Sequence, residues 1–170
     1  SIMIGSGRMK MPEGPECRRI AEGLAIAVSG KKITQIEILG GRYQKNEMSG
    51  LSKFQEMLPI GVAGAGVHGK FIYLICEKEM SIWNTLGMSG SWKISPGKHS
   101  RIRFGLSDGT SVYFDDMRNF GTLKMVAGKH QLIEKLQSLG PDMLSDDISP
   151  ADFVTMLRKK NDVNICKVLM

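Results

Sequence analysis

Cysteine is scarce in this sequence, and no two cysteines are close together. Cys17, Cys76 and Cys166 are the only three among 170 residues. Because there is no CxxC pair, the sequence supports neither a zinc ribbon nor a disulfide framework. Separated thiols of this kind are typical of a reducing compartment. We therefore expect an intracellular protein that is not secreted.

Long hydrophobic runs are missing as well. No apolar stretch is long enough to cross a membrane, so we expect no membrane partner. Residues 1–10 lack the apolar centre of a secretory signal. They contain Gly5-Ser6-Gly7, which is typical of a flexible linker. We interpret residues 1–10 as an extension or as the remainder of an expression tag.

The charge composition excludes little. The formal net charge is +6, and 24% of the residues are charged while 42% are hydrophobic. These values are ordinary for a globular chain, which at this length can bury one substantial core, or one domain and part of another. The positive charge is compatible with a polyanionic partner such as nucleic acid, although many globular domains reach the same value.

A first helix is predicted to begin near residue 15. Pro15 suits the first helical position, because its missing N–H would be unpaired there anyway. Glu16 would face the positive end of the helix dipole, and Gly30 ends the pattern. Apolar residues recur at a spacing of three to four, which predicts one face packed on a core: Cys17, Ile20, Ala21, Leu24 and Val28.

Short apolar segments between turn signals predict a series of β-strands. A short helix is predicted at 49–58, and strands are predicted at 33–39, 60–67, 71–76, 80–86, 91–94, 101–106, 111–114 and 121–126. Residues 71–76 are nearly all apolar, as expected for a strand covered on both faces. Closely spaced strands of this kind predict a mainly β fold with flanking helices, built as an antiparallel β-sandwich.

The pattern changes from strands to helices near residue 128. A helix is predicted at 131–139, and Gly140-Pro141 ends it. Further helices are predicted after residues 149 and 163, and the chain stops on three apolar residues, 168–170. We expect a fragment of a longer protein, with a β-sandwich domain at 11–127 followed by the start of an α-helical domain at 128–170.

Whether the Pro12 nitrogen can react as a nucleophile depends on where translation begins. If Met11 is the initiator and is removed, Pro12 carries a free secondary amine, which can attack a sugar C1′ and form an iminium. α-Amino groups titrate close enough to neutrality for part of them to be unprotonated there. Glu13 beside it could act on the sugar as acid or base. A plain helix start is the simpler interpretation of the same residues.

Four stretches resemble one known family in the same order along the chain. Residues 11–16, Met-Pro-Glu-Gly-Pro-Glu, resemble the start of the formamidopyrimidine-DNA glycosylase and endonuclease VIII (Fpg/Nei) family. The others are 67–74, 86–91 and 116–121. The resemblance covers residues 11–170. Gly14 in place of leucine favours the Nei-like branch, which prefers oxidised pyrimidines and hydantoins.

The resemblance implies catalytic roles for four residues: Pro12, Glu13, Glu16 and Lys70. Pro12 would attack C1′ of a damaged nucleoside while Glu13 assists the sugar, and β- and δ-elimination would then cut the strand. Glu16 would support proton transfer or the geometry of Pro12. Lys70 would hold the DNA backbone near the lesion, although a lysine there also fits a strand edge that avoids pairing.

The resemblance also implies a set of DNA-binding residues: Met88, His99, Arg118, Asn119 and Phe120. Met88 would enter the gap left by the everted base, which suits its flexible side chain. Arg118 would face the orphaned base, and Phe120 would wedge beside it. His99 would contact a phosphate, whereas Asn119 replaces an arginine of many relatives and offers no charge. Without the resemblance, Phe120 fits a core position, and Arg118 and His99 fit a solvated surface.

The expected function is base-excision DNA repair by a bifunctional DNA glycosylase/AP lyase. It would act as a monomer on damaged double-stranded DNA, in the nucleus or the cytoplasm. The resemblance implies no cofactor in this chain, with zinc only in a C-terminal finger that the chain lacks. The alternative is a catalytically inactive DNA-binding or structural fragment, because the helical domain is truncated and residues 1–10 would make Pro12 an ordinary amide.

Overall fold

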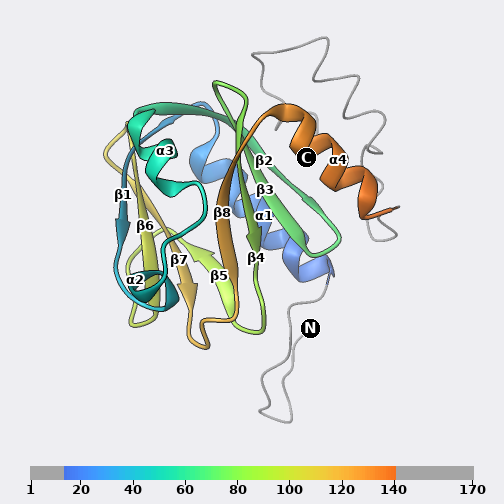
Figure 1. The fold of residues 1–170 in the computed structure, drawn as a ribbon. Helices are drawn as coiled ribbons and strands as arrows, with labels where there is room; N and C mark the ends of the chain where they lie inside the picture. Colours follow the sequence, from blue (N-terminus) through green and yellow to red (C-terminus); the bar gives the residue numbers. More distant parts are fainter. Residues whose placement is uncertain (1–13, 141–170) are drawn as a thin grey trace.

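The computed structural model describes residues 14–140 (Figure 1). The helices there are α1 (Gly14–Val28), α2 (Arg42–Lys45), α3 (Leu51–Glu56) and α4 (Lys129–Ser138). The strands are β1 (Lys32–Ile38), β2 (Ile60–His68), β3 (Phe71–Cys76), β4 (Met80–Thr85), β5 (Gly90–Lys93), β6 (Ser100–Leu106), β7 (Ser111–Asp116) and β8 (Thr122–Ala127). Pro12, Glu13 and the helices predicted after residue 140 lie outside the described residues.

The strands within residues 14–140 match the predicted ones. Of the two short helices, one was predicted and one was not. Helix α3 lies inside the predicted 49–58 segment, while α2 was not predicted. Helix α2 has only four residues and starts after Gly41, whose φ is 82°. A single turn is too short to show a helical period, and a left-handed φ favours glycine at that position.

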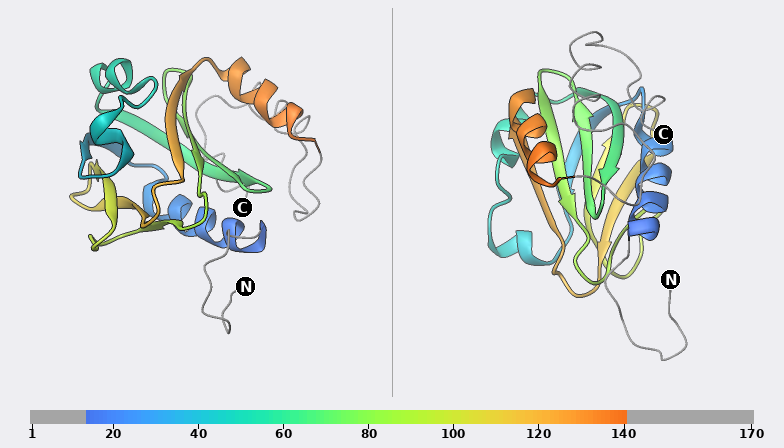
Figure 2. Two further views of the ribbon diagram at one scale, coloured as in Figure 1. Left: turned by 60° about the horizontal axis from the view of Figure 1, so that its bottom comes forward. Right: turned by 90° about the vertical axis from the view of Figure 1, so that its right-hand side faces the viewer.

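The strands form one antiparallel sheet that folds over into two layers. The strand order is β5-β7-β6-β1-β2-β3-β4-β8. Strands β1 and β2 are paired only at Lys32↔Gly61 and Ile33↔Ile60, whereas β1 and β6 are paired along most of their length. The sheet bends at this short junction, and its two halves face each other (Figure 2). This arrangement confirms the predicted antiparallel β-sandwich with flanking helices.

Strand β3 is the most deeply buried strand in the described part of the chain, because both of its faces are covered. Ile72, Leu74 and Cys76 pack in the main core between the layers, which also takes the apolar face of α1. The alternate residues Phe71 and Tyr73 point the other way, into a smaller cluster beneath α4. Figure 2 shows α1 and α4 on opposite sides of the sheet layers. The predicted double burial of residues 71–76 is confirmed.

Helix α4 docks onto this second face of β3. Its Leu132 and Leu136 are buried against Phe71 and Tyr73. The Lys135 ammonium lies 5.5 Å from the centre of the Phe71 ring and 5.9 Å from that of Trp83. These are distances at which a cation and an aromatic face attract. The domain boundary expected after residue 127 stays a prediction.

Because its thiol is buried, Cys76 is expected to make the fold less stable as the pH rises above 9. Burial, together with the neighbouring Glu77 carboxylate, raises the pKa of the Cys76 thiol from 9.0 to about 12. Between these values the unfolded chain loses a proton that the folded chain keeps, so ionisation favours the unfolded state. We expect the free energy of unfolding to fall as the pH rises from 9 to 12, with a contribution from Cys76 of at most about 1.4 kcal/mol per pH unit.

The measurement is denaturant unfolding at several pH values for the wild type and Cys76→Ala. Other groups also titrate in this window, so the difference between the two proteins isolates the thiol. The alanine variant should start less stable and lose stability less steeply. Equal slopes for the two proteins would contradict the prediction.

Candidate functional site

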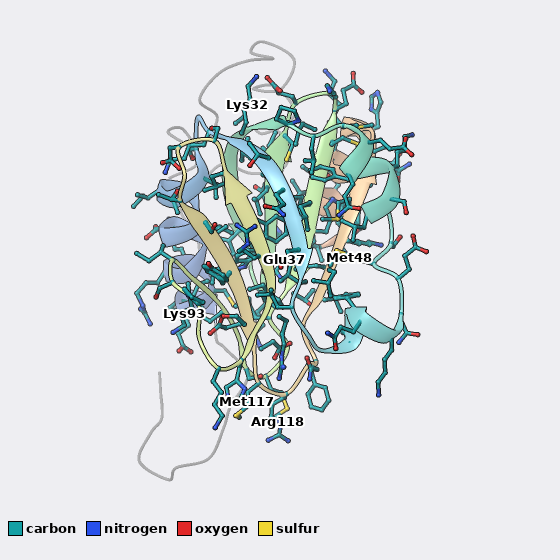
Figure 3. The ribbon with its side chains drawn as sticks, turned by 90° about the vertical axis from the view of Figure 1, so that its left-hand side faces the viewer. Lys32, Glu37, Met48, Lys93, Met117 and Arg118 are labelled. Carbon is teal, nitrogen blue, oxygen red and sulfur yellow. The ribbon has the colours of Figure 1, made fainter. Side chains whose placement is uncertain are left out.

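Two loops that carry candidate DNA-binding residues lie at the same end of the sandwich. One is the β4–β5 turn, residues 86–89, and the other is the β7–β8 loop, residues 117–121 (Figure 1). Figure 3 places Met117 and Arg118 at this end and Lys32 at the opposite end. Met88, Arg118 and Phe120, which are far apart in the sequence, thus lie on two loops at one rim of the sandwich. That this rim is on the same side as Pro12 stays a prediction.

Glycines allow the backbones of these loops to touch. A Cβ at Gly87 would lie 2.7 Å from the Phe120 carbonyl carbon and 2.8 Å from the Gly121 nitrogen. A Cβ at Gly121 would lie 2.8 Å from the Thr85 carbonyl oxygen. Real Cβ atoms do not approach other atoms so closely. Gly87 also has a φ of +60°, which side chains rarely adopt. Glycine at both positions therefore makes the joint loop surface possible.

The loop surface presents apolar and cationic side chains to solvent. Phe120 is 53% exposed and Met117 is 41% exposed, so the core alternative for Phe120 is wrong. The Arg118 guanidinium carbon lies 5.7 Å from the centre of the Phe120 ring, which is a cation–π contact. Met88 is half-buried in its turn. An exposed aromatic ring beside an arginine suits contact with nucleic-acid bases.

Asn119 belongs to the β7–β8 loop, and His99 lies in the turn before β6. Asn119 has a left-handed φ of 59°, and its Oδ1 lies 2.4 Å from where a Cβ on Gly41 would be, so its side chain rests against the start of α2. His99 is half-buried in the turn before β6. Its carbonyl accepts a hydrogen bond of 3.0 Å from the Asp116 N–H. Their expected phosphate contacts stay predictions.

Lys70 lies in the β2–β3 turn and lines a pocket of about 290 Å³. The lining residues come from α1, from α4 and its C-cap, from the ends of β2, β3 and β4, and from the β2–β3 and β4–β5 turns: Cys17, His68, Lys70, Phe71, Thr85, Leu86, Gly87, Lys135 and Leu139. Lys70 is exposed, and Gly87 belongs to the turn that carries Met88. The pocket therefore joins the predicted catalytic lysine to the rim loops. Glu16 lies in the first turn of α1, one residue before Cys17.

Three further contributors to the site were not found from the sequence. His68 Nε2 lies 2.5 Å from the carbonyl oxygen of Gly140, and Lys135 enters the pocket from α4. Asp116 is 1% exposed and bonds to both rim loops. Asp116 belongs to the family-like stretch 116–121, but the sequence indicated no role for it. Its burial in the structure shows that it supports the loops. Residues 14–140 contain no group of three His, Cys, Asp or Glu that could hold a metal ion.

The family is settled by a sequence comparison. The model of the formamidopyrimidine-DNA glycosylase N-terminal domain matches residues 11–123. The chain belongs to the formamidopyrimidine-DNA glycosylase family. The matched range includes all four stretches that carry the resemblance, from the Pro12 stretch to the rim loop at 116–121.

Curated relatives of this Fpg-family chain are considerably longer. The formamidopyrimidine-DNA glycosylase of Salinispora arenicola (strain CNS-205) is 32% identical over 158 residues, which are 88% of this chain and 55% of the relative. The enzyme of the same name from Deinococcus radiodurans is 31% identical over 157 residues, covering 86% of this chain and 53% of the relative. The chain thus spans about half the length of the curated relatives it matches.

Solved structures show the same fold. A MutM structure in complex with DNA containing carbocyclic 8-oxo-G matches with a TM-score of 0.65 and 21% identity, over 75% of this chain and 48% of that one. Lactococcus lactis Fpg (MutM), in a complex with DNA containing N7-benzyl-Fapy-dG, matches with a TM-score of 0.64 and 20% identity, over 75% and 48% of the two chains. The Nei-like preference expected from Gly14 stays a prediction.

The contact between the rim loops can be tested with two glycines. Gly87 and Gly109 both have a positive φ, but a Cβ at Gly109 would meet nothing within 4 Å. We expect Gly109→Ala to cost about 1 kcal/mol of stability through backbone strain alone. Gly87→Ala should cost a further 1–3 kcal/mol, roughly, because the methyl group forces the loops apart. Denaturant unfolding of both variants measures the difference, and equal losses would show that the loops are not in contact.

Proposed function

We propose that this Fpg-family chain is the N-terminal catalytic part of a base-excision DNA glycosylase that also cleaves the resulting abasic site. The observation that carries this proposal is the convergence of the rim loops with the pocket that Lys70 lines. A family-typical lysine and a family-typical wedge, far apart in sequence, share one end of the fold. The curated relatives are formamidopyrimidine-DNA glycosylases, which supports the glycosylase part of this proposal.

The proposed reaction uses the amine of Pro12 as its nucleophile. The nitrogen lone pair forms a bond to C1′ while the glycosidic bond breaks, and the damaged base leaves with that electron pair and takes up a proton. The nitrogen bound to C1′ then loses its proton, and its lone pair forms the C=N bond of an iminium while the C1′–O4′ bond breaks and O4′ takes up a proton. The iminium permits loss of a C2′ proton and β-elimination of the 3′ phosphate, followed by δ-elimination. Glu13 would assist the sugar as acid or base, and Glu16 would support Pro12.

The surroundings of α1 support this assignment, although Pro12 itself lies outside the described residues. Gly14, which begins α1, is two residues after Pro12 in the sequence. Cys17 in the first turn of α1 lines the same pocket as Lys70. The start of α1 therefore borders the cavity in which we propose that the lesion sugar reacts. Lys70 would hold the phosphate beside that sugar as a point charge.

The rim loops would keep the lesion out of the duplex. Everting a base costs a few kcal/mol, and wedge side chains recover part of that cost. Met88 would enter the gap, Arg118 would face the orphaned base, and Phe120 would stack beside it. The substrate would be damaged double-stranded DNA, bound by a monomer inside the cell. Oxidised pyrimidines or hydantoins are the lesions that we propose.

The proposed nucleophile can be tested by borohydride trapping. We expect the full-length protein that begins at a free Pro12 to become covalently linked to lesion-containing duplex when borohydride is present, because borohydride reduces the iminium to a stable amine. The matched control is the same protein with residues 1–11 retained, which has an amide in place of the amine. The measurement is the fraction of labelled DNA that is shifted on a denaturing gel, over a panel of oxidised bases.

Each outcome of the trapping experiment has a clear meaning. Trapping by the free-proline form alone supports the proposal. Equal trapping by both forms would rule out the Pro12 amine. If neither form is trapped on any lesion, the chain acts as a DNA-binding or structural element.

Lys70 gives a second test of the same function. We expect Lys70→Leu to change stability by about 0.5 kcal/mol or less, because the side chain is exposed. Base excision should fall much more than cleavage of a preformed abasic site. Lys32→Leu is the control, since Lys32 is also exposed but lies at the opposite end of the sandwich (Figure 3). A loss of folding with unchanged activity per folded molecule would assign Lys70 a structural role instead.

A further inference from the structure

Asp116 is a buried carboxylate that lies between the two rim loops. It ends β7, and only 1% of it is exposed. Its Oδ1 accepts a hydrogen bond of 2.5 Å from the Ser89 hydroxyl in the β4–β5 turn. Its Oδ2 accepts one of 2.7 Å from the Gly121 N–H in the β7–β8 loop. One side chain thus joins the two loops that carry the proposed wedge.

Ser89 continues the connection to Arg118. The Ser89 oxygen accepts a hydrogen bond of 2.9 Å from the Arg118 backbone N–H. A hydroxyl has one hydrogen to donate and two lone pairs to accept with. Because the Ser89 hydrogen is donated to Asp116, its lone pairs are available to the Arg118 N–H. The chain of bonds Arg118–Ser89–Asp116 fixes where the Arg118 backbone lies relative to the Met88 turn.

Neighbouring bonds hold the same loop from the outer side. The Arg101 Nε donates to the Asp116 carbonyl at 2.9 Å, and the Arg42 guanidinium donates to the Gly121 carbonyl at 3.1 Å. The Phe120 side chain stays exposed among these contacts. The backbone of the loop is thus held on several sides, while its proposed wedge side chain remains free to meet DNA.

We propose that Ser89 and Asp116 are positioning residues that hold Met88, Arg118 and Phe120 as one preformed wedge. This proposal rests on the proposed function, because it assigns a purpose to the wedge in base eversion. Neither residue would touch the reacting atoms. Their bonds would fix the loop geometry before DNA arrives, so that inserting the wedge costs little ordering of the loops.

A variant with a loosened wedge should therefore have an excision rate that depends on how firmly the damaged base is paired. Eversion is cheapest for a base that is already unpaired. A loosened wedge should therefore slow excision from a fully paired duplex and hardly affect a lesion inside an unpaired bubble. A residue with a merely structural role would lower both rates by the same factor, through the fraction of folded protein. The ratio of the two rates separates these cases.

The experiment compares Ser89→Ala with Ser107→Ala in the full-length protein with a free Pro12. Ser107 is exposed and accepts a hydrogen bond of 3.0 Å from the Lys32 N–H, at the other end of the sandwich (Figure 3). Both substitutions remove a hydroxyl that accepts a hydrogen bond from a backbone N–H, and Ser89 in addition donates one to Asp116. Single-turnover excision is measured for one lesion in a matched duplex and in a bubble, and thermal unfolding is measured for each protein.

We expect Ser89→Ala to slow excision from the matched duplex by about tenfold, because two hydrogen bonds are lost. Excision from the bubble should change less than twofold, and Ser107→Ala should match the wild type on both substrates. Equal slowing on both substrates, or no slowing on either, would overturn the positioning role. If the wild type excises no lesion from either substrate, the proposed function fails instead.

Discussion

The burial of β3 on both faces is the constraint on which the rest of the fold depends. A strand with six apolar residues has side chains on two faces, and each face must be removed from water. One face is covered by the folded-over sheet and α1, and the other by α4. The turn before β3 carries Lys70, so the strand that organises both cores also determines where the candidate catalytic lysine lies.

The rim loops show how a binding surface can be built from backbone contact. Gly87 and Gly121 bring two turns into contact, and no residue with a Cβ fits at either place without a shift. The turns then act as one surface, from which Phe120 projects although its ring is apolar. An exposed ring next to an arginine contributes little to folding. Its position is explained more simply by a partner that stacks on it.

The proposed catalytic pocket and the proposed wedge would thus be held in place by different kinds of interaction. The pocket lined by Lys70 is framed by α1, the β2–β3 turn and α4, and both helices are held by apolar packing. The wedge is held by polar bonds that centre on Asp116. Apolar packing gives a rigid pocket wall, while directional hydrogen bonds fix the angle of a loop. Gly87 belongs to both regions and links them.

The sequence by itself determined the strands, the double burial of residues 71–76 and the family, because apolar periodicity, turn residues and short motifs are local features. It also indicated Lys70, Met88, Arg118 and Phe120, although only through resemblance. Helix α2 was missed, since four residues carry no period. Tertiary structure alone decided that Phe120 is exposed and that Ser89 and Arg118 are bonded across 29 positions. It also placed Asp116 and Lys135, because contacts between distant residues depend on how the sheet folds over, and no local pattern records that.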